Sequence, residues 1–152
     1  MKYIGVLLVL ISLVVPVSHA GQSGLIVKKS EYSTEKTIKR LKAVLAQKGI
    51  RVFAHVNHFE NAASVGLKIR PTELLIFGNP KLGTPLIKSN PAAGLDLPMK
   101  VLVWQDEKGQ TWLVYNDPAY IAKRHGISDQ GEAVAKMSQA LGKMTDQALT
   151  PN

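Results

Sequence analysis

The segment from Lys100 to Asn116 limits the fold most, because it reads as two strands joined by a very short loop. β-Branched and aromatic residues dominate both sides of the loop, as they do in strands. The loop, Glu107-Lys108-Gly109, puts glycine where a three-residue hairpin needs a left-handed residue. A loop of this length fixes the register of the strands, and Trp104 is then expected opposite Trp112. The chain therefore contains an antiparallel sheet.

Two amphipathic helices are predicted, one before and one after the strand-rich middle of the chain. The first begins at the N-cap Ser33, buries one apolar stripe and ends at Gly49. The second begins after Ser128 and carries a seam of apolar residues at three- and four-residue spacing. Its methionines are typical of a core rather than of a copper or redox site. Both helices are expected to pack on the sheet.

Further strands are predicted at residues 24–29, 51–57 and 74–77. In the second of these strands, Val52, Ala54 and Val56 are expected on one face. Leu74-Leu75-Ile76-Phe77 is apolar on both faces, which is typical of a central strand covered on both sides by helices or by a partner chain. The segment 87–97 is expected to be a loop, because proline and glycine interrupt it.

The first 20 residues are predicted to be an export signal. Lys2 precedes an almost wholly apolar run from Ile4 to Val15, and Ser18-His19-Ala20 provides small residues for cleavage. A bilayer-spanning helix needs about 20 apolar residues, so the run is too short to span. We expect a single mature domain over residues 21–152 that is exported to a bacterial periplasm, with no integral membrane segment after cleavage. A signal that is retained as a membrane anchor is the alternative.

The charge and cysteine content limit the classes of partner and site that this chain can have. Lys and Arg outnumber Asp and Glu by 19 to 11, which in an exported chain indicates acidic headgroups, envelope polymers or small anions rather than nucleic acid. Many basic residues fall between Ser33 and Gly49, where a solvated helix face explains them without a partner. The chain has no cysteine, which excludes disulfides, thiolate metal sites and a cysteine nucleophile.

The segment Gly78–Thr84 is the first candidate for a ligand site. Its glycine spacing, Gly78-x-x-x-x-Gly83 followed by Thr84, is that of a phosphate loop, but no lysine follows Gly83, so no nucleotide site is predicted. Asn79 and a helix opening at Pro80 would instead offer free N–H groups to an anion, together with Lys81 and Thr84. A well-capped turn explains the same residues.

Two histidines lie near the end of the predicted strand at residues 51–57. His55 and His58 are three residues apart, which places them on opposite faces of a strand, whereas a helical zinc pair needs a spacing of four. No metal site is therefore predicted. His58 is expected at the mouth of a pocket, or else as a half-buried histidine bonded to backbone.

Several motifs together resemble one known family. These are Asn57–Ala62, Gly66-Leu67, Arg70–Leu86, Leu95-Asp96-Leu97-Pro98, Trp104 and Tyr115–Pro118. In order and spacing they resemble the domain-of-unknown-function 302 family over the whole mature chain. The resemblance implies an α+β fold with an antiparallel-rich sheet and helices on one face, of the β-α-β4-α type, and homodimers. It implies no activity. The family often has an acidic residue where this chain has Asn57, which weakens any mechanism that pairs His58 with a neighbouring carboxylate.

The function predicted first is a non-catalytic envelope module that binds a small or acidic ligand, with His58, Asn79, Lys81, Thr84 and Asp96 as its ligand-binding residues. A structural dimerisation module is the second interpretation, since one layer of helices leaves the other apolar face of the sheet uncovered. An enzyme with His58 as general base, oriented by Asp96 or Asn79, is the third. No cofactor is expected.

Overall fold

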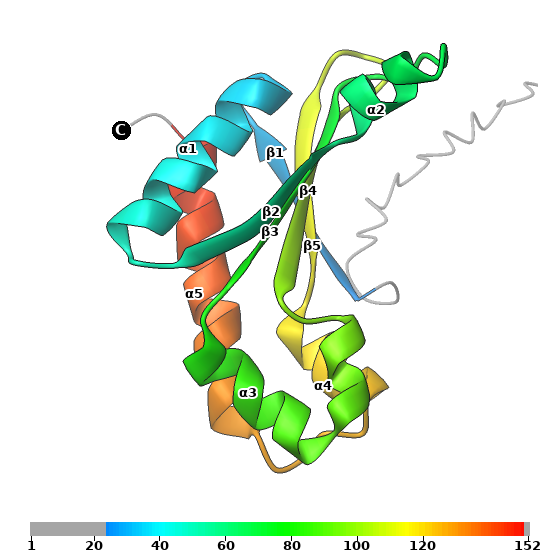
Figure 1. Cartoon of the computed structure of the whole chain (residues 1–152). Coiled ribbons are helices and arrows are strands. Elements are labelled where there is room, and N and C mark those ends of the chain that lie inside the picture. Colours follow the sequence, from blue (N-terminus) through cyan, green and yellow to red (C-terminus); the bar gives the residue numbers. More distant parts are fainter. Residues whose placement is uncertain (1–23, 151–152) are drawn as a thin grey trace, which may run out of the picture.

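Five strands form one antiparallel sheet in the order β1-β5-β4-β3-β2 in this computed structural model, which describes residues 24–150 (Figure 1). The strands are β1 (Leu25–Ser30), β2 (Arg51–Asn57), β3 (Thr72–Gly78), β4 (Met99–Gln105) and β5 (Thr111–Asn116). The predicted export signal lies outside the described residues.

Helices occupy the connections and the carboxy-terminal part. They are α1 (Thr34–Gln47), α2 (His58–Ser64), α3 (Pro80–Ser89), the 3-10 helix η1 (Pro91–Leu95), α4 (Pro118–Arg124) and α5 (Gly131–Leu149). The predicted α+β fold is confirmed: one strand, one helix, four strands and a long helix, with the short helices inserted between them. No helix among residues 24–150 combines the length and apolar content that a membrane crossing requires.

The hairpin of β4 and β5 has the predicted register, with Trp104 opposite Trp112. Asp106 fixes its turn, because one carboxylate oxygen accepts hydrogen bonds from the backbone N–H groups of Lys108 and Gln110. The other oxygen accepts from Trp112 Nε1 at 2.8 Å. The Trp112 hydrogen bond is the largest cause that lowers the pKa of Asp106.

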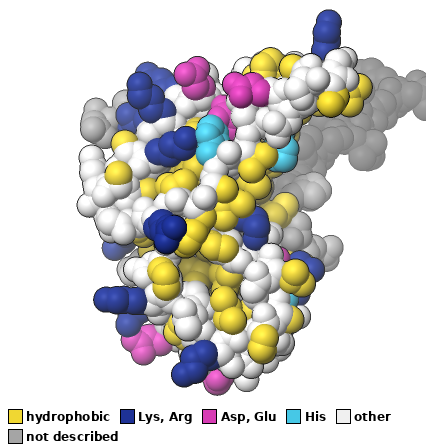
Figure 2. Space-filling model, in the orientation of Figure 1, with side chains coloured by type: hydrophobic (Ala, Val, Ile, Leu, Met, Phe, Trp, Pro, Cys, Tyr) yellow, Lys and Arg dark blue, Asp and Glu magenta, His cyan; other side chains and the backbone are white. Residues whose placement is uncertain are grey.

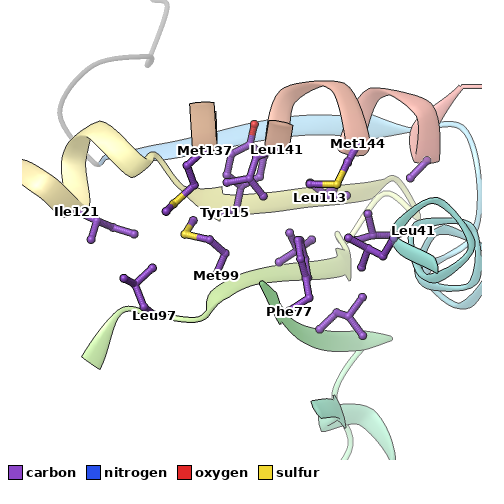
Figure 3. Close-up of a cluster of buried hydrophobic side chains, with 14 of the residues drawn as sticks. Leu41, Phe77, Leu97, Met99, Leu113, Tyr115, Ile121, Met137, Leu141 and Met144 are labelled. Carbon is purple, nitrogen blue, oxygen red and sulfur yellow. The ribbon is translucent and has the colours of Figure 1, made fainter. Parts of the chain in front are cut away.

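The core lies between the sheet and the two long helices (Figure 3). Ser33 caps α1 as predicted, and its side chain accepts from the N–H of Lys36. Leu41 of α1 and Leu141 of α5 are buried against Phe77 and other strand residues. Each such side chain contributes roughly 1.5–3 kcal/mol by leaving water. The methionines of α5 belong to this core, as predicted.

The opposite face of the sheet carries a continuous apolar row with one residue from each strand. In register these residues are Val27, Val114, Leu102, Leu74 and Val56. All five are exposed or half-buried, and Val27 is 55% exposed. The helices α1 and α5 thus cover one face of an apolar sheet and leave this row accessible.

Two local predictions about the helices were wrong. Segment 87–97 is not a loop, because α3 continues through Pro85 to Ser89 and η1 follows; the fully buried Leu86 anchors α3 to the core. The last helix begins at Gly131 rather than after Ser128. The carboxylate of Asp129, between these two positions, instead accepts a 2.6 Å hydrogen bond from Ser89 and ties the loop to α3.

The strand β2 contains a register shift between Val52 and Ala54. Val52 therefore pairs with Phe77, whereas Ala54 pairs with Ile76 on the open face. The prediction that Val52, Ala54 and Val56 share one face was wrong for this reason. Phe53 is the extra residue at the bulge and is 44% exposed.

Candidate functional site

An apolar cavity lies where β3 passes into α3, between α3, η1 and α5. Its volume is about 250 Å³. Phe77, Leu97 and Leu141 form part of the wall together with the methionines Met99, Met137 and Met144. Met99 and Met137 both line the cavity and point toward one another in Figure 3. Figure 2 shows hydrophobic side chains in a recess in the middle of this face, with Lys and Arg side chains beside it.

The rim of the cavity combines the β2 bulge with the residues that follow β3. Phe53 reaches the cavity because the bulge places it there, and Arg51 lies over its ring at 5.0 Å. Gly78 lets Pro98 approach closely, since a Cβ on Gly78 would lie 3.3 Å from the Pro98 Cβ. Asn79 and Thr84 are polar residues in the same lining.

Asn79 caps α3, which confirms that a helix opens at Pro80. Its side-chain oxygen accepts from the Lys81 N–H at 2.9 Å. Its carbonyl oxygen accepts from the N–H groups of Leu82 at 3.0 Å and Gly83 at 3.1 Å. The N–H groups that were expected to be free for an anion are therefore already paired. Only side chains remain to attract a negative group here.

Such side chains line a second hollow, of about 480 Å³, which we call the lysine groove. Its lysines are Lys48, Lys81, Lys136 and Lys143, and among residues 24–150 no acidic side chain belongs to its lining. Lys136 pairs with Glu132 outside the lining. The lysine groove and the cavity share five lining residues: Ile50, Asn79, Leu82, Ala140 and Met144. The two hollows are thus adjacent.

Asp96 lies outside the lining of both hollows. Its carboxylate is 2.7 Å from His125 Nε2 and 3.5 Å from Arg124 Nη1. The Asp96 and His125 side chains are only 14% and 8% exposed. Asn90 adds a 2.8 Å hydrogen bond from its side-chain nitrogen to the His125 carbonyl. These contacts hold η1 against the end of α4. Leu97, the residue after Asp96, forms part of the cavity wall.

His58 is far from the other candidates. It is the exposed first residue of α2, at the end of β3 opposite to Asn79 (Figure 1). The seven residues of β3 span roughly 20 Å at strand spacing. The structure therefore places Asn79, Lys81 and Thr84 in the linings of the two hollows. Asp96 lies outside both linings, next to the wall residue Leu97. His58 lies at the other end of β3.

A separate polar cluster joins α1 to the sheet. His55 Nε2 is 2.7 Å from a carboxylate oxygen of Glu73, and His55 Nδ1 is 3.0 Å from Lys42 Nζ. A charged lysine only donates, so Nδ1 accepts and Nε2–H donates to Glu73. Glu73 is 7% exposed. The imidazole thus compensates for burial of this carboxylate, which is a structural role.

Sequence reasoning missed most of the cavity, because its wall comes from elements distant in the chain. One available signal was the helical spacing of Lys136, Ala140 and Lys143, which puts these residues on one face of α5. That face meets Lys48, at the end of α1, and Lys81 at the lysine groove.

Comparisons with known proteins agree with the fold. The sequence pattern of the family described as "Domain of unknown function DUF302" matches residues 26–144. The chain is 40% identical over 134 residues to two proteins named fluoride-specific ion channel FluC 1, from Brucella suis biovar 1 (strain 1330) and Brucella abortus biovar 1 (strain 9-941). That match covers 88% of this chain but only 53% and 50% of those proteins. The chain thus spans about half the length of these curated relatives.

A crystal structure of an uncharacterized conserved DUF302 protein from Bacillus stearothermophilus is similar, with a TM-score of 0.74. The likeness covers 83% of this chain and 98% of that one at 23% sequence identity. At this identity the likeness supports the fold alone.

Proposed function

We propose that this chain, which belongs to the domain of unknown function DUF302 family, is a non-catalytic binding module whose small ligand occupies the cavity between α3, η1 and α5. The observation that carries the proposal is the cavity itself: an apolar space with the polar residues Asn79 and Thr84 in its lining. Apolar walls with a few polar groups are typical of small-molecule sites.

The same lining favours binding over catalysis. None of the described residues that line the cavity has an acidic, basic or histidine side chain. General acid–base catalysis needs a titratable group within hydrogen-bond reach of the reacting proton. His58 lies at the other end of β3, and Asp96 is engaged with His125. An enzyme that uses His58 as its base therefore has no geometric support.

The methionines provide a direct test. The chain has four methionines, and Met99, Met137 and Met144 line the cavity, while the fourth is Met1. We would label the methionine methyl groups with ¹³C and titrate the protein with small carboxylates, phosphates and neutral fragments. A ligand in the cavity should shift the signals of these three methyl groups together. If no compound shifts them at millimolar concentration, the binding proposal is wrong.

A structural dimerisation module is the second candidate, and the open apolar row on the sheet favours it. Two copies that face each other through Val114, Leu102 and Leu74 would remove these side chains from water. Light scattering should then report twice the monomer mass at micromolar protein. A monomer under these conditions would rule out this candidate.

We also propose export to the cell envelope. The pattern of Lys2 followed by the apolar run Ile4–Val15 supports this location. Two relatives, of which this chain spans about half, are named fluoride-specific ion channels, and because an ion channel works in a membrane, these names also support an envelope location. Mass spectrometry of the protein from its native host should find Gly21 at the amino terminus. A mature protein that retains Lys2 would refute cleavage.

A further inference from the structure

We infer that the ligand of the cavity is a medium-chain amphiphile with an anionic head group, held with its chain in the cavity and its head in the lysine groove. This inference rests on the proposed binding function and names the class of ligand.

The volume sets the length of the chain. The cavity holds about 250 Å³, which corresponds to roughly eight groups the size of a water molecule at about 30 Å³ each. This volume lies below the 300–1,000 Å³ that is typical of sites for drug-sized ligands. A flexible chain of about eight carbons fits such a space, and so does a small ring, since a cavity of about 150 Å³ holds benzene. Methionine side chains are unbranched and adapt their shape to a chain of this kind.

The lining sets the polarity of the ligand. The cavity has Leu97, Met99 and Leu141 in its wall, so a charged group inside it would lack partners. The lysine groove has Lys48, Lys81, Lys136 and Lys143, and no described residue of its lining is acidic. A negative group there would meet the charges of Lys48, Lys81 and Lys143, while Lys136 is already paired with Glu132.

Because the two hollows are adjacent, one ligand can meet both requirements. Ala140 and Met144 of α5, with Ile50 and Leu82 opposite, belong to both linings. A ligand that spans this boundary must have one apolar end and one anionic end. Carboxylate and phosphate heads share this chemistry.

Calorimetric titration of the full chain with three probes tests the inference. Octanoate should bind at least about tenfold more tightly than octanol, which lacks the charge, or acetate, which lacks the chain. Within the carboxylates, each added methylene should raise affinity about fourfold up to about eight carbons and little beyond, because about 0.8 kcal/mol per methylene is gained only while the cavity has room. Octyl phosphate identifies which head is preferred.

Variants locate each end of the ligand. Gly83→Leu should abolish octanoate binding because the leucine side chain fills the cavity; a Cβ on Gly83 lies 3.8 Å from Leu97 Cδ1. The α3 helix should still form, since leucine has a higher helix propensity than glycine. Gly83→Ala is its matched control and should bind nearly normally. The pair Lys81→Gln with Lys143→Gln should weaken octanoate about tenfold and leave octanol unchanged. Lys88→Gln with Lys123→Gln removes two exposed lysines outside both hollows and should change neither.

The outcomes separate the inference from the function beneath it. If octanol binds as tightly as octanoate, or if the two lysine pairs behave alike, the anionic head is wrong while cavity binding stands. If octanoate binds Gly83→Leu as it binds the wild type, and the melting temperature shows that the variant is folded, the cavity is not the site. If no amphiphile binds but another small compound shifts the three methionine methyl groups, the ligand class is wrong and the binding function holds.

Discussion

Deleting the Asp96 carboxylate should destabilise the protein rather than remove a ligand contact. Asp96→Ala leaves His125 Nε2 without its 2.7 Å partner in a site where the His125 side chain is 8% exposed. A hydrogen bond to a charged group contributes about 1.5–3 kcal/mol, and that contribution should be lost. For a domain of this size the melting temperature should fall by about 5–10 °C.

A double-mutant cycle isolates this contact. Asp96→Ala, His125→Ala and the double variant should be measured by urea denaturation, and the two changes should be non-additive by about 1–3 kcal/mol. His125→Ala keeps the backbone carbonyl that accepts from Asn90. The matched control is Glu107→Ala, because Glu107 is 88% exposed and 3.9 Å from Arg70; it should cost less than about 1 kcal/mol.

The same variants decide between the structural and the ligand-binding role of Asp96. If Asp96→Ala keeps the wild-type melting temperature and loses affinity for a cavity ligand tenfold, Asp96 contacts the ligand, and the reasoning from its burial fails. If stability falls and His125→Ala has the same effect, Asp96 holds the wall that Leu97 provides.

Three further changes test other parts of the structure. Asp106→Asn should reduce stability at neutral pH, because Trp112 lowers the folded pKa of Asp106. The stabilisation is present above the unfolded pKa of about 4 and is lost as pH falls through the lower folded value. Urea denaturation followed by tryptophan fluorescence should therefore show the difference between the two proteins shrinking as pH falls below about 4; a constant gap would contradict the assignment. Lys28→Met should cost about 1–2 kcal/mol in urea, because Lys28 bridges β1 to Thr145 at 2.8 Å and Asp146 at 2.7 Å; equal midpoints would show that the bridge contributes nothing. Val114→Lys should halve the mass in light scattering if the open face forms a dimer, and an unchanged mass would place the interface elsewhere.

Local rules predicted the elements whose geometry is fixed by nearby residues. The short loop set the pairing of Trp104 with Trp112, and the N-cap Ser33 marked the start of α1. The same rules failed where distant contacts prevailed. Proline and glycine suggested a loop over residues 87–97, yet α3 continues past Pro85 to Ser89, with Leu86 fully buried.

The candidate site shows the same division. Asn79 was recognisable as a cap from its neighbour Pro80, and its place at the cavity follows from the end of β3. The role of Asp96 was not recognisable, because its partner His125 is 29 residues away on another element. The bulge in β2 was equally hidden, since an extra residue in a strand leaves an ordinary sequence and reverses the faces that follow it.

The position of β1 at the edge of the sheet has a consequence for folding. Strands β2 to β5 pair with their neighbours in sequence, so each pairing needs only the connection between successive strands. The strand β1 cannot pair until β5 is available. Lys28 cannot form its hydrogen bond until Thr145, 117 residues further along the chain, is available. Closing so long a loop is entropically costly, which makes docking of β1 a late step. If the chain is exported with its amino terminus first, as proposed above, β1 can therefore join the sheet only after β5 has crossed the membrane.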